Sequence, residues 1–506
     1  MLNYKTSSRI SLILSFILIA SLLSACSTSP ASSLNGIQKI RHVVIIFQEN
    51  RSFDSYFGTY PGALGIPMKN GKPNVCVNNP STGTCVQPYP DHQDENGGGP
   101  HNDVNSVADI NGGKMNGFIT QAENGKRGCL VPTNPACTNS NAIDVMGYHT
   151  QSDIPNYWTY ANDFVLQDHM FESVHSWSFP SHLYLVSGWS ANCTDPNSPK
   201  SCVSAVDPNL ASKSDPTPYG WTELTWLLHK HNISWSWYLD NGAVPLASSK
   251  LKLGKLHSDK RSALSSGSAN SDSTSNSGST KHITAATPSR TGVPRIWNVL
   301  PGFTDVHQDK QDKNIQDLSN FYSAAKSGNL PAISWVLPDA TDSEHPPALV
   351  SVGQSYVTSI VNAVMKSPDW NSTAIFITWD DWGGFYDNVV PPTVDALGYG
   401  IRVPGLVISP YAKAGYIDHQ QLSFDAYLKF IEDDFLSGET LNPKTDGRPD
   451  NRPDVRESSS QLGNLINDFN FSQSPRKPVI LPISPKTTLI CPGGSSPSTD
   501  GKCLSK

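Results

Sequence analysis

The sequence has little charge and no excess of positive charge. Only 16% of its 506 residues are charged, and 37 Lys and Arg stand against 44 Asp and Glu, which gives a formal net charge of −7. This balance offers no general attraction to nucleic acid, so we expect no nucleic-acid partner. The low charge, together with 37 glycines and 39 prolines, excludes a coiled coil or a disordered acidic chain and indicates a loop-rich globular protein.

Long apolar runs are also lacking outside the N-terminus. No later stretch reaches about 18 consecutive apolar residues, so we expect no transmembrane helix. The N-terminal sequence MLNYKTSSRISLILSFILIASLLSAC combines Lys5 and Arg9 with an apolar segment from Ile10 to Leu23 and then small residues. This arrangement is typical of a secretory signal peptide.

The last four residues of that segment, LSAC, resemble a bacterial lipobox, in which cleavage leaves the cysteine as the lipid-bearing first residue. We predict a lipoprotein signal peptide over residues 1–26, a lipid anchor on Cys26 and a flexible tether over residues 27–36. The alternative is a plain signal peptide with a chance cysteine at its end. We therefore expect an exported bacterial protein, either secreted or held at the membrane of the cell envelope by its lipid.

Cysteine is sparse, and the eight cysteines other than Cys26 fall into four close pairs within Gly-, Pro-, Asn- and Ser-rich sequence. An even number of cysteines in an exported protein usually forms disulfides. Sequential pairing is favoured because short polar loops hold their ends close together. We predict the local disulfides Cys76–Cys85, Cys129–Cys137, Cys193–Cys202 and Cys491–Cys503. No C-x2-C spacing and no nearby His-x3-His supports a zinc site built on these cysteines.

One long segment lacks almost all apolar residues. Residues 257–292 are nearly all Ser, Thr, Gly, Asn and Ala, which cannot bury enough surface to offset the entropy of ordering. We predict a disordered insertion, because the patterns on its two sides look like parts of one fold. The expected organisation is one catalytic domain over residues 37–440, followed by a Pro-rich C-terminal tail over residues 441–506.

Several short apolar runs have the pattern of buried strands. They cover residues 42–47, 163–167, 232–239, 332–337, 373–378 and 403–409. Helical patterns cover residues 181–188, 221–230, 314–326, 353–366 and 423–436. Strands that alternate with helices predict an α/β fold with a mostly parallel central sheet sandwiched by helices.

Polar residues follow the ends of several predicted strands, where open α/β sheets bind their ligands. They include Glu49, Asn50, Asp168, His169, Asp339, Asp380 and Asp381. Several carboxylates cannot share a small site without a cation, because like charges raise one another's pKa. Oxygen ligands predict a divalent metal such as Ca²⁺, Mg²⁺ or Mn²⁺, and a nearby histidine keeps Zn²⁺ or Fe open.

The residues after the first strand have a second interpretation. Glu49 could instead cap a helix that begins in NRSFDSYF, and the strand pattern alone does not decide between the metal and the cap. Under the metal interpretation, we expect Arg51 and Asp54 to pair or to cap the turn that follows.

The stretch IRHVVIIFQENRSFDSYFGTYPG resembles the signature of the bacterial phosphoesterase family that contains phosphatidylcholine-type phospholipases C and metal-dependent acid phosphatases. The resemblance continues through most of the mature chain, including TWDDWGGFYDNVVPP and SWVLPDATDSEHPP. The matching blocks cover residues 112–119, 153–188, 296–306, 334–347, 378–392 and 401–419. The resemblance implies an α/β sandwich similar to that of alkaline phosphatases and sulfatases.

The resemblance also implies a metal-binding set. Glu49 and Asn50 match the family's metal-binding pair, and Asp380 and Asp381 match the acidic pair of a late strand. Many relatives have Asp-Glu at the second pair, so the shorter Asp381 changes the reach of one ligand. The family's nucleophile is a Ser or Thr shortly before a Pro, and Ser178 lies at that position and would also contact the metal.

Two neighbouring serines are weaker candidates for the nucleophile, Ser176 and Ser181. Relatives often have T-x-P-N-R where this chain has Ser178-Phe179-Pro180-Ser181-His182. His182 therefore replaces an arginine, and we assign it to substrate binding.

Histidines complete the set that the resemblance implies. His345, in SEHPP, matches a family active-site histidine that could protonate the leaving oxygen or bind phosphate. His101, in GGPHND, is a candidate for phosphate contact. Gly383 and Gly384 permit tight backbone approach or positive φ just after the acidic pair. Asn388 replaces a histidine that is frequent in relatives.

These residue types suit phosphoryl transfer. A serine hydroxyl is a poor nucleophile at neutral pH, and metal coordination can favour its alkoxide. In-line attack on phosphorus then gives a phosphoseryl intermediate, whose charge a cation and hydrogen-bond donors stabilise.

The sequence thus predicts an exported, metal-dependent phosphoric ester hydrolase that acts on a phosphomonoester or a phospholipid. No extended lipid-binding region is visible after about residue 440, which favours a compact phosphatase-like form. The competing hypothesis is a cell-surface binding lipoprotein on the same fold that has lost activity, as the altered arginine and histidine positions would suggest. The retained site residues argue against it, because a dead site has no chemical reason to keep them all.

Overall fold

Most of the chain is described by the computed structural model, which covers residues 36–210, 218–240, 292–445 and 447–494. Several predictions concern residues outside these ranges, namely the signal peptide with Cys26, most of the tether, nearly all of the insertion at 257–292, and Cys503. Within the described ranges, none of the helices has the length and apolar character needed to span a membrane.

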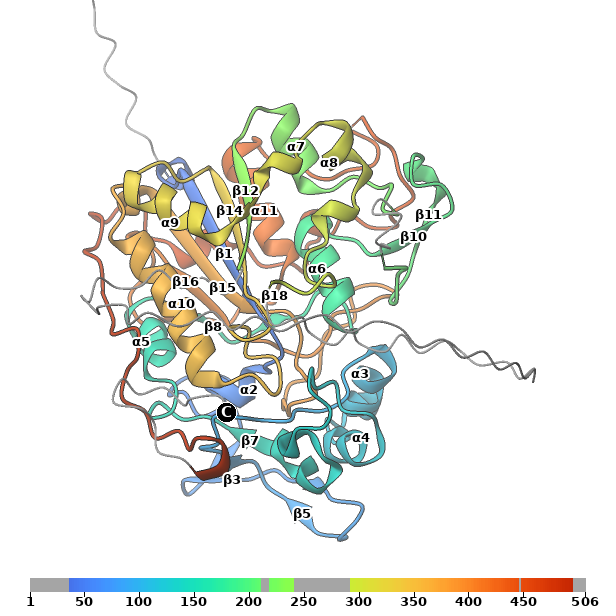
Figure 1. The fold of residues 1–506 in the computed structure, drawn as a ribbon, viewed down its shortest axis with the longest axis vertical. Coiled ribbons are helices and arrows are strands. Elements are labelled where there is room, and N and C mark those ends of the chain that lie inside the picture. Colours follow the sequence, from blue (N-terminus) through green and yellow to red (C-terminus); the bar gives the residue numbers. More distant parts are fainter. Residues whose placement is uncertain (1–35, 211–217, 241–291, 446, 495–506) are drawn as a thin grey trace, which may run out of the picture.

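An eight-stranded sheet forms the centre of the molecule (Figure 1), with the strand order β13-β12-β14-β1-β15-β16-β8-β17. In this order the strands span Ile315–Asp317, Trp235–Leu239, Ile333–Leu337, His42–Gln48, Thr373–Trp379, Gly405–Ile408, Val165–Gln167 and Tyr416–Asp418. Only β16 is antiparallel to its neighbours. The predicted mostly parallel sheet is confirmed. The sequence pattern missed its two short edge strands, β13 and β17, and the helix predicted over 314–326 is wrong at residues 315–317, which form β13.

Helices cover both faces of this sheet, which confirms the predicted sandwich. Figure 1 shows α5, α9 and α10 on one face, with α6 and α11 on the other. The helices are α2 Phe53–Phe57, α3 Asp103–Ile110, α4 Phe118–Asn124, α5 Pro155–Asp163, α6 Ser178–Ser187, α7 Leu224–Lys230, α8 Thr304–Gln308, α9 Leu318–Ser327, α10 Val350–Met365 and α11 Asp425–Phe435.

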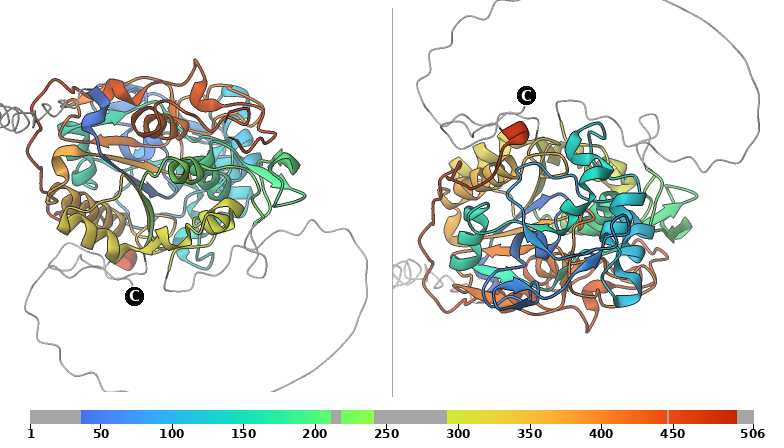
Figure 2. Two further views of the ribbon diagram at one scale, coloured as in Figure 1. Left: turned by 90° about the horizontal axis from the view of Figure 1, so that it is seen from above. Right: turned by 90° about the horizontal axis from the view of Figure 1, so that it is seen from below.

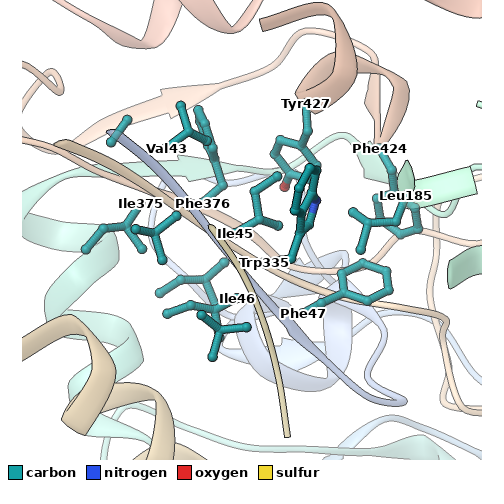
Figure 3. Packing of buried hydrophobic residues seen from close by; sticks show 14 of the residues in the cluster. Val43, Ile45, Ile46, Phe47, Leu185, Trp335, Ile375, Phe376, Phe424 and Tyr427 are labelled. Carbon is teal, nitrogen blue, oxygen red and sulfur yellow. The ribbon is translucent and has the colours of Figure 1, made fainter. Parts of the chain in front are cut away.

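The alternation of side chains in the central strands explains the two helical layers. In β15, the Phe376 ring lies 5.1 Å from the Tyr427 ring of α11, whereas the Trp379 ring lies 5.3 Å from the Tyr157 ring of α5. In β1, Ile45 points toward Tyr427 and Ile46 lies on the other side of the strand (Figure 3). Because both faces are covered, β1 is a continuous apolar run and not an alternating one.

The segment between α2 and α5 forms a loop-rich cap below the sheet in Figure 1, on the side where β1 leads into α2. Figure 2 shows this cap from below. It contains α3 and α4 and three small ribbons, β2 (Met68–Lys69) with β3 (Lys72–Pro73), β4 (Val77–Asn78) with β5 (Cys85–Val86), and β6 (Tyr89–Pro90) with β7 (Gly147–Tyr148). Two further ribbons lie elsewhere, β10 (Ala191–Cys193) with β11 (Cys202–Ser204) and β9 (Met170–Phe171) with β18 (Leu422–Ser423).

The turn after β1 decides between the two interpretations of Glu49. The side chain of Ser52 caps α2 by accepting a hydrogen bond from the Ser55 N–H at 3.2 Å. The prediction of Glu49 as the helix cap is therefore wrong, and its carboxylate remains available beyond the strand. The Arg51–Asp54 pair is also not formed, because Asp54 pairs with Arg402 at 3.2 Å.

Residues 447–494, in the predicted tail, pack against the rest of the fold. Leu465 and Phe469 are buried in the main hydrophobic core. The Arg452 guanidinium is also buried, and it donates to the Ser187 and Thr222 carbonyls at 3.0 and 2.8 Å. The domain boundary near residue 440 stays a prediction.

Three of the four predicted disulfides are present, Cys76–Cys85, Cys129–Cys137 and Cys193–Cys202. Cys193 and Cys202 lie directly opposite each other in the β10–β11 ribbon. The fourth pair involves Cys503, which lies outside the described residues, so Cys491–Cys503 stays a prediction.

Two of these disulfides allow a matched stability test, because each joins cysteines nine positions apart. Replacing both Cys193 and Cys202 by Ser should lower the free energy of unfolding by about 2–3 kcal/mol, since a short loop constrains the unfolded chain only modestly. The same change at Cys76 and Cys85 should give a similar loss in denaturant unfolding under non-reducing conditions. Unequal losses would show that local packing, and not loop length, sets the contribution.

Candidate active site

The candidate site lies at the carboxyl ends of β1 and β15, which pair in parallel through their full lengths. Glu49 and Asn50 therefore emerge beside Asp380 and Asp381. Two hydrogen bonds fix this junction: the Asp380 N–H donates to the Gln48 carbonyl at 2.9 Å, and the Asn50 N–H donates to Asp380 Oδ1 at 2.8 Å. The four predicted metal-binding residues are thus brought together, and all four are fully buried.

A close backbone approach completes this junction. Asn50 has φ of 59°, and Gly383 faces it with φ of 61°. A Cβ atom on Gly383 would lie 2.7 Å from the Asn50 Cβ, so any other residue at 383 would displace the turn. Gly384 has φ of 75°, which agrees with the predicted need for glycine at both positions.

The Asn50 side chain is oriented by its own hydrogen bonds. Its Nδ2 donates to Asp381 Oδ1 at 2.8 Å and to His101 Nε2 at 3.2 Å. The ring nitrogen can accept because His101 Nδ1 donates to the Gly99 carbonyl at 2.9 Å. Both amide hydrogens are thereby used, and the remaining Oδ1 is free to act as a ligand.

Ser178 is brought to the same carboxylates by α6, of which it is the first residue. Its Oγ donates to Asp381 Oδ2 at 3.2 Å. The other two serine candidates have other partners: Ser176 Oγ donates to the Val206 carbonyl at 2.7 Å, and Ser181 Oγ donates to Glu172 at 3.1 Å. Ser178 is therefore the serine of this segment whose hydroxyl contacts the carboxylate cluster, and the helix N-terminus there favours an anion.

When the carboxyl groups are ionised, three buried oxygen atoms in the site have no hydrogen-bond donor: Glu49 Oε2, Asn50 Oδ1 and Asp380 Oδ2. Buried polar atoms in proteins are nearly always paired, so three orphans in one place require an explanation. Carboxylate and amide oxygens are the ligands that hard divalent cations prefer. The residues present therefore fit a divalent metal ion, with Glu49, Asn50 and Asp380 as the first ligands to consider.

The charges of the site also require a partner. Burial, followed by repulsion from Asp380, raises the pKa of Glu49 and of Asp381 well above the usual range. The pKa of Asp380 is lowered although burial opposes this, because Glu49 and His182 stabilise its charged form. Within the described ranges, no lysine or arginine forms an ion pair with these three carboxylates, so a bound cation would permit all three to be ionised.

His182 lies inside the metal cluster. Its Nε2 is 2.8 Å from Glu49 Oε1, and ligand atoms of His182, Glu49 and Asp380 all lie within 4.8 Å of one another. Burial lowers the pKa of His182 to about 4, which leaves a neutral imidazole. Its predicted role in substrate binding stays a prediction, but this position also suits a nitrogen ligand for Zn²⁺ or Fe. The sequence signal for this was the histidine in place of the family's arginine.

His101 and His345 lie next to each other beside Asn50, with ring centroids 5.8 Å apart. His345 Nδ1 donates to the Pro346 carbonyl at 3.0 Å, so Nε2 holds the lone pair of the neutral ring. Burial and the adjacent His101 lower the pKa of His345 to about 3. Burial also lowers the pKa of His101.

A buried hydrogen-bond network that the sequence analysis missed holds the residue before His345. Glu344 accepts hydrogen bonds from Tyr56 Oη at 2.6 Å, Tyr157 Oη at 2.6 Å and Trp379 Nε1 at 3.0 Å. These contacts hold the backbone directly before His345. Burial raises the pKa of Glu344 to about 7, although Arg51 and the three donors oppose the shift. The only sequence signal was its place beside His345 in SEHPP.

Glu172 is a second residue that sequence reasoning missed. It is fully buried, and its Oε1 accepts from the Ser176 N–H at 3.3 Å and from Ser181 Oγ at 3.1 Å. These two partners lie on either side of Ser178, so Glu172 holds the segment that presents the nucleophile candidate. An isolated glutamate in FES gave no signal of this role.

Other polar residues at the carboxyl edge form separate groups. Asp339 lies with Asp240 and Asp342, and Asp168 lies with His169 and His419. The prediction that Asp168, His169 and Asp339 share one crowded edge is right, but they do not join the site of Glu49. Strand order explains this for Asp168 and His169, since β16 separates β8 from β15 and each strand adds about 4.8 Å.

Asp387 and Asn388 contact a buried arginine and not the candidate metal ligands. Arg402 donates to Asp387 Oδ1 at 2.9 Å, and to Asn388 Oδ1 at 3.0 Å. It also pairs with Asp54, so the turn after β15 is tied to α2. Asn388 therefore accepts a hydrogen bond from Arg402 at the position where the family resemblance predicts a histidine.

Comparison with known proteins gives one family. The model of the Phosphoesterase family matches residues 40–436. Phospholipase C B of Mycobacterium tuberculosis is 25% identical over 486 residues, which cover 86% of this chain and 78% of that protein. The non-hemolytic phospholipase C of Burkholderia pseudomallei is 27% identical over 488 residues, with 88% of this chain and 61% of that protein covered.

The chain also has similarity to a plant protein and to a solved structure. Non-specific phospholipase C6 of Arabidopsis thaliana is 26% identical over 420 residues, which cover 75% of this chain and 63% of that protein. A crystal structure of Ps i-CgsB in complex with k-i-k-neocarrahexaose gives a TM-score of 0.32 at 10% identity, covering 79% of this chain and 72% of that one. Such a low score supports no argument about fold or function.

The family match covers most of the 506 residues and includes every side chain of the candidate site. The chain therefore belongs to the phosphoesterase family and is a hydrolase that acts on phosphoric ester bonds.

Proposed function

We propose that the protein is an exported, metal-dependent phosphoric ester hydrolase of the phospholipase C type, in which Ser178 is the nucleophile. The observation that supports this most is the set of three unpartnered buried oxygens, Glu49 Oε2, Asn50 Oδ1 and Asp380 Oδ2, beside the Ser178–Asp381 hydrogen bond. A divalent ion held by these oxygens would lower the pKa of the serine hydroxyl and offset charge on the phosphoryl group.

The protein's own residues have separate tasks in this proposal. Asp381 Oδ2 accepts the hydroxyl hydrogen of Ser178, and so holds the proton that leaves when Oγ attacks phosphorus. The first N–H groups of α6 point toward the incoming anion, as at other helix N-termini that bind phosphate. Glu172 fixes the backbone on both sides of the nucleophile. Attack breaks the phosphoric ester bond and leaves a phosphoseryl group that water then hydrolyses.

His345 is proposed to protonate the leaving oxygen. Its Nδ1–H is held by the Pro346 carbonyl, so the transferred proton has to sit on Nε2. A phosphate anion that enters the site would favour this protonated form, because an opposite charge nearby raises the pKa of an imidazole. His101, whose Nδ1 is likewise held, is proposed to contact the phosphate beside it.

The relatives favour a phospholipid over a phosphomonoester as substrate. The curated proteins compared above, two bacterial and one plant, are all named phospholipase C. The phosphatase-like alternative depends only on the lack of a visible lipid-binding region after residue 440. That lack does not indicate which phosphate ester the active site binds. We therefore propose cleavage of phosphatidylcholine-type lipids on the glycerol side of the phosphate, with acid phosphatase activity as the alternative outcome.

Export is supported by the three disulfides, because such bonds persist in oxidising compartments. The lipid anchor at Cys26 stays part of the proposal. The inactive binding protein is disfavoured by the preserved juxtaposition of Ser178, Asp381 and the orphan oxygens, which has no purpose in a site without chemistry.

Replacing Ser178 by Ala should abolish turnover, because no hydroxyl remains to attack phosphorus. Phosphate-ester cleavage should be measured on phosphatidylcholine and on an alkyl phosphomonoester, with the wild type cleaving the lipid faster. Ser176→Ala is the matched control and should keep wild-type activity, because its hydroxyl donates to the Val206 carbonyl and its backbone N–H can still donate to Glu172. Full activity of Ser178→Ala would contradict the mechanism. If the wild type cleaved only the phosphomonoester, the proposed lipid substrate would be wrong and the protein would act as a phosphatase.

Replacing Asp380 by Ala should remove bound metal and activity together, since a cation with few protein ligands tolerates poorly the loss of an anionic one. Elemental analysis after dialysis gives the metal bound per chain, which should fall by one ion in this variant, and activity is assayed in parallel. Excess metal should partly restore Asp380→Ala and should leave Ser178→Ala inactive. Rescue of both variants, or retention of metal and activity by Asp380→Ala, would show that the cation is held elsewhere.

The His345→Gln change should slow cleavage of alkyl esters by about 10²–10⁴-fold, the usual range for a lost general acid. Esters of p-nitrophenol should lose much less, because their leaving group needs no proton. Since the pKa of His345 is lowered to about 3, its protonated fraction in the free enzyme falls with rising pH, so wild-type kcat/KM on the alkyl ester should fall as well.

The pH dependence of kcat/KM provides the control for this prediction. In the His345→Gln variant, the decrease of kcat/KM that is caused by deprotonation of His345 should disappear. Ionisation of the substrate still affects kcat/KM of both proteins equally. Equal losses on alkyl and p-nitrophenyl esters would assign His345 to phosphate binding instead.

A further inference from the structure

A second cluster of metal-ligating side chains lies at the same edge of the sheet, outside the candidate active site. It consists of Asp168, His169 and His419, called the edge triad below. One ligand atom from each residue lies within 4.8 Å of the other two. Asp168 is fully buried, whereas the side chains of His169 and His419 are 22% and 60% exposed, so the triad opens to solvent on one side.

Two strand pairings hold the edge triad in place. The segments 165–171 and 416–423 pair first as β8 with β17 and then again as β9 with β18. The triad occupies the interruption between these pairings. There the Asp168 N–H donates to the Asp418 carbonyl at 3.1 Å, and the Leu422 N–H donates to the His169 carbonyl at 2.9 Å. Ligands placed on such doubly fixed backbone are preorganised.

The atoms of the edge triad are spaced like neighbouring ligands of one metal ion. His169 Nδ1 lies 2.7 Å from Asp168 Oδ1, and His419 Nδ1 lies 3.0 Å from Oδ1 and 2.8 Å from Oδ2. Metal–nitrogen and metal–oxygen bonds of about 2.0–2.2 Å place adjacent ligand atoms roughly 3 Å apart. The Leu64 N–H also donates to Asp168 Oδ2 at 2.8 Å, and so orients the carboxylate.

We propose that the edge triad binds a divalent transition-metal ion of the Zn²⁺ class. Two imidazole nitrogens with one carboxylate oxygen favour Zn²⁺, Cu²⁺, Ni²⁺ or Fe²⁺ over Ca²⁺ and Mg²⁺, which prefer oxygen. The exposed side of His419 leaves room for water at the remaining positions. The ion replaces the hydrogens that the two imidazoles otherwise donate to Asp168.

This ion would be distinct from the one proposed for catalysis. The candidate active site lies at the end of β15, and β16 intervenes before β8. Two strand spacings amount to about 10 Å, which exceeds the roughly 3.5–4 Å that separates the ions of two-metal catalytic centres. The edge ion therefore clamps the short edge strand β17 to β8 and takes no part in phosphoryl transfer.

The main alternative is a purely hydrogen-bonded triad, in which both imidazoles donate to Asp168 and no metal binds. His419→Gln separates the two cases. A glutamine amide can still donate a hydrogen bond toward Asp168, but it is a poor ligand for Zn²⁺. The change therefore spares a structural hydrogen bond and removes a metal ligand.

The experiment measures Zn²⁺ bound per chain by equilibrium dialysis and elemental analysis, with Zn²⁺ as the only added metal. We expect His419→Gln and His169→Gln each to bind one ion fewer than wild type, through a loss of affinity of more than about 100-fold, since even loss of an outer-sphere partner costs 10–100-fold. His307→Gln is the matched control, because His307 contacts Asp312 and the Pro301 carbonyl and belongs to no cluster of metal-ligating side chains in the described residues, and it should bind as wild type does. Equal zinc content in wild type and both triad variants would overturn the proposal.

Asp380→Ala distinguishes this proposal from that for the active site. Zn²⁺ should raise the melting temperature of Asp380→Ala, because an ion that binds only the folded state stabilises it. The same addition should leave the Asp380→Ala, His419→Gln double variant unchanged. An equal rise in both proteins would overturn the edge site, whatever the outcome for catalysis.

Discussion

The in-register parallel pairing of β1 with β15 is the constraint on which the rest of the site depends. It places Glu49 and Asn50 beside Asp380 and Asp381 in a region closed to solvent. Burying several carboxylates costs a large free energy unless a cation or hydrogen bonds compensate for it. The apolar residues of β1 form the buried strand. Its pairing with β15 brings the carboxylates that follow the two strands close together, so their negative charges repel one another.

The hydrogen bonds around the site orient its side chains, but they do not neutralise the negative charge of its carboxylates. Asn50 donates its amide hydrogens to Asp381 and His101, so its oxygen is left to bind a metal ion. Glu172 fixes the loop around Ser178, and Glu344 fixes the backbone before His345. Each of these contacts removes freedom from a side chain whose direction matters for chemistry, which is how a buried polar site becomes preorganised.

Sequence patterns were sufficient for six of the eight strands of the central sheet, because buried parallel strands are continuous apolar runs with polar residues at their ends. They were also sufficient for the edge at which the site lies. They could not show which edge residues meet, since that depends on strand order: Asp168 follows a strand as Asp380 does, yet β16 separates the two. The role of Glu344 depends on partners 35 to 288 positions away, which no local pattern encodes.

His182 shows how one residue type alters the balance of charge in the site. An arginine there, which the family resemblance leads one to expect, would bring a permanent positive charge next to Glu49. The histidine is instead neutral, because burial lowers its pKa to about 4, and its Nε2 lies 2.8 Å from the Glu49 carboxylate. The site therefore has three carboxylates and no protein cation paired with them in the described ranges. A metal ion held there would supply positive charge, and the nitrogen of His182 would give that ion a softer ligand than the oxygens alone.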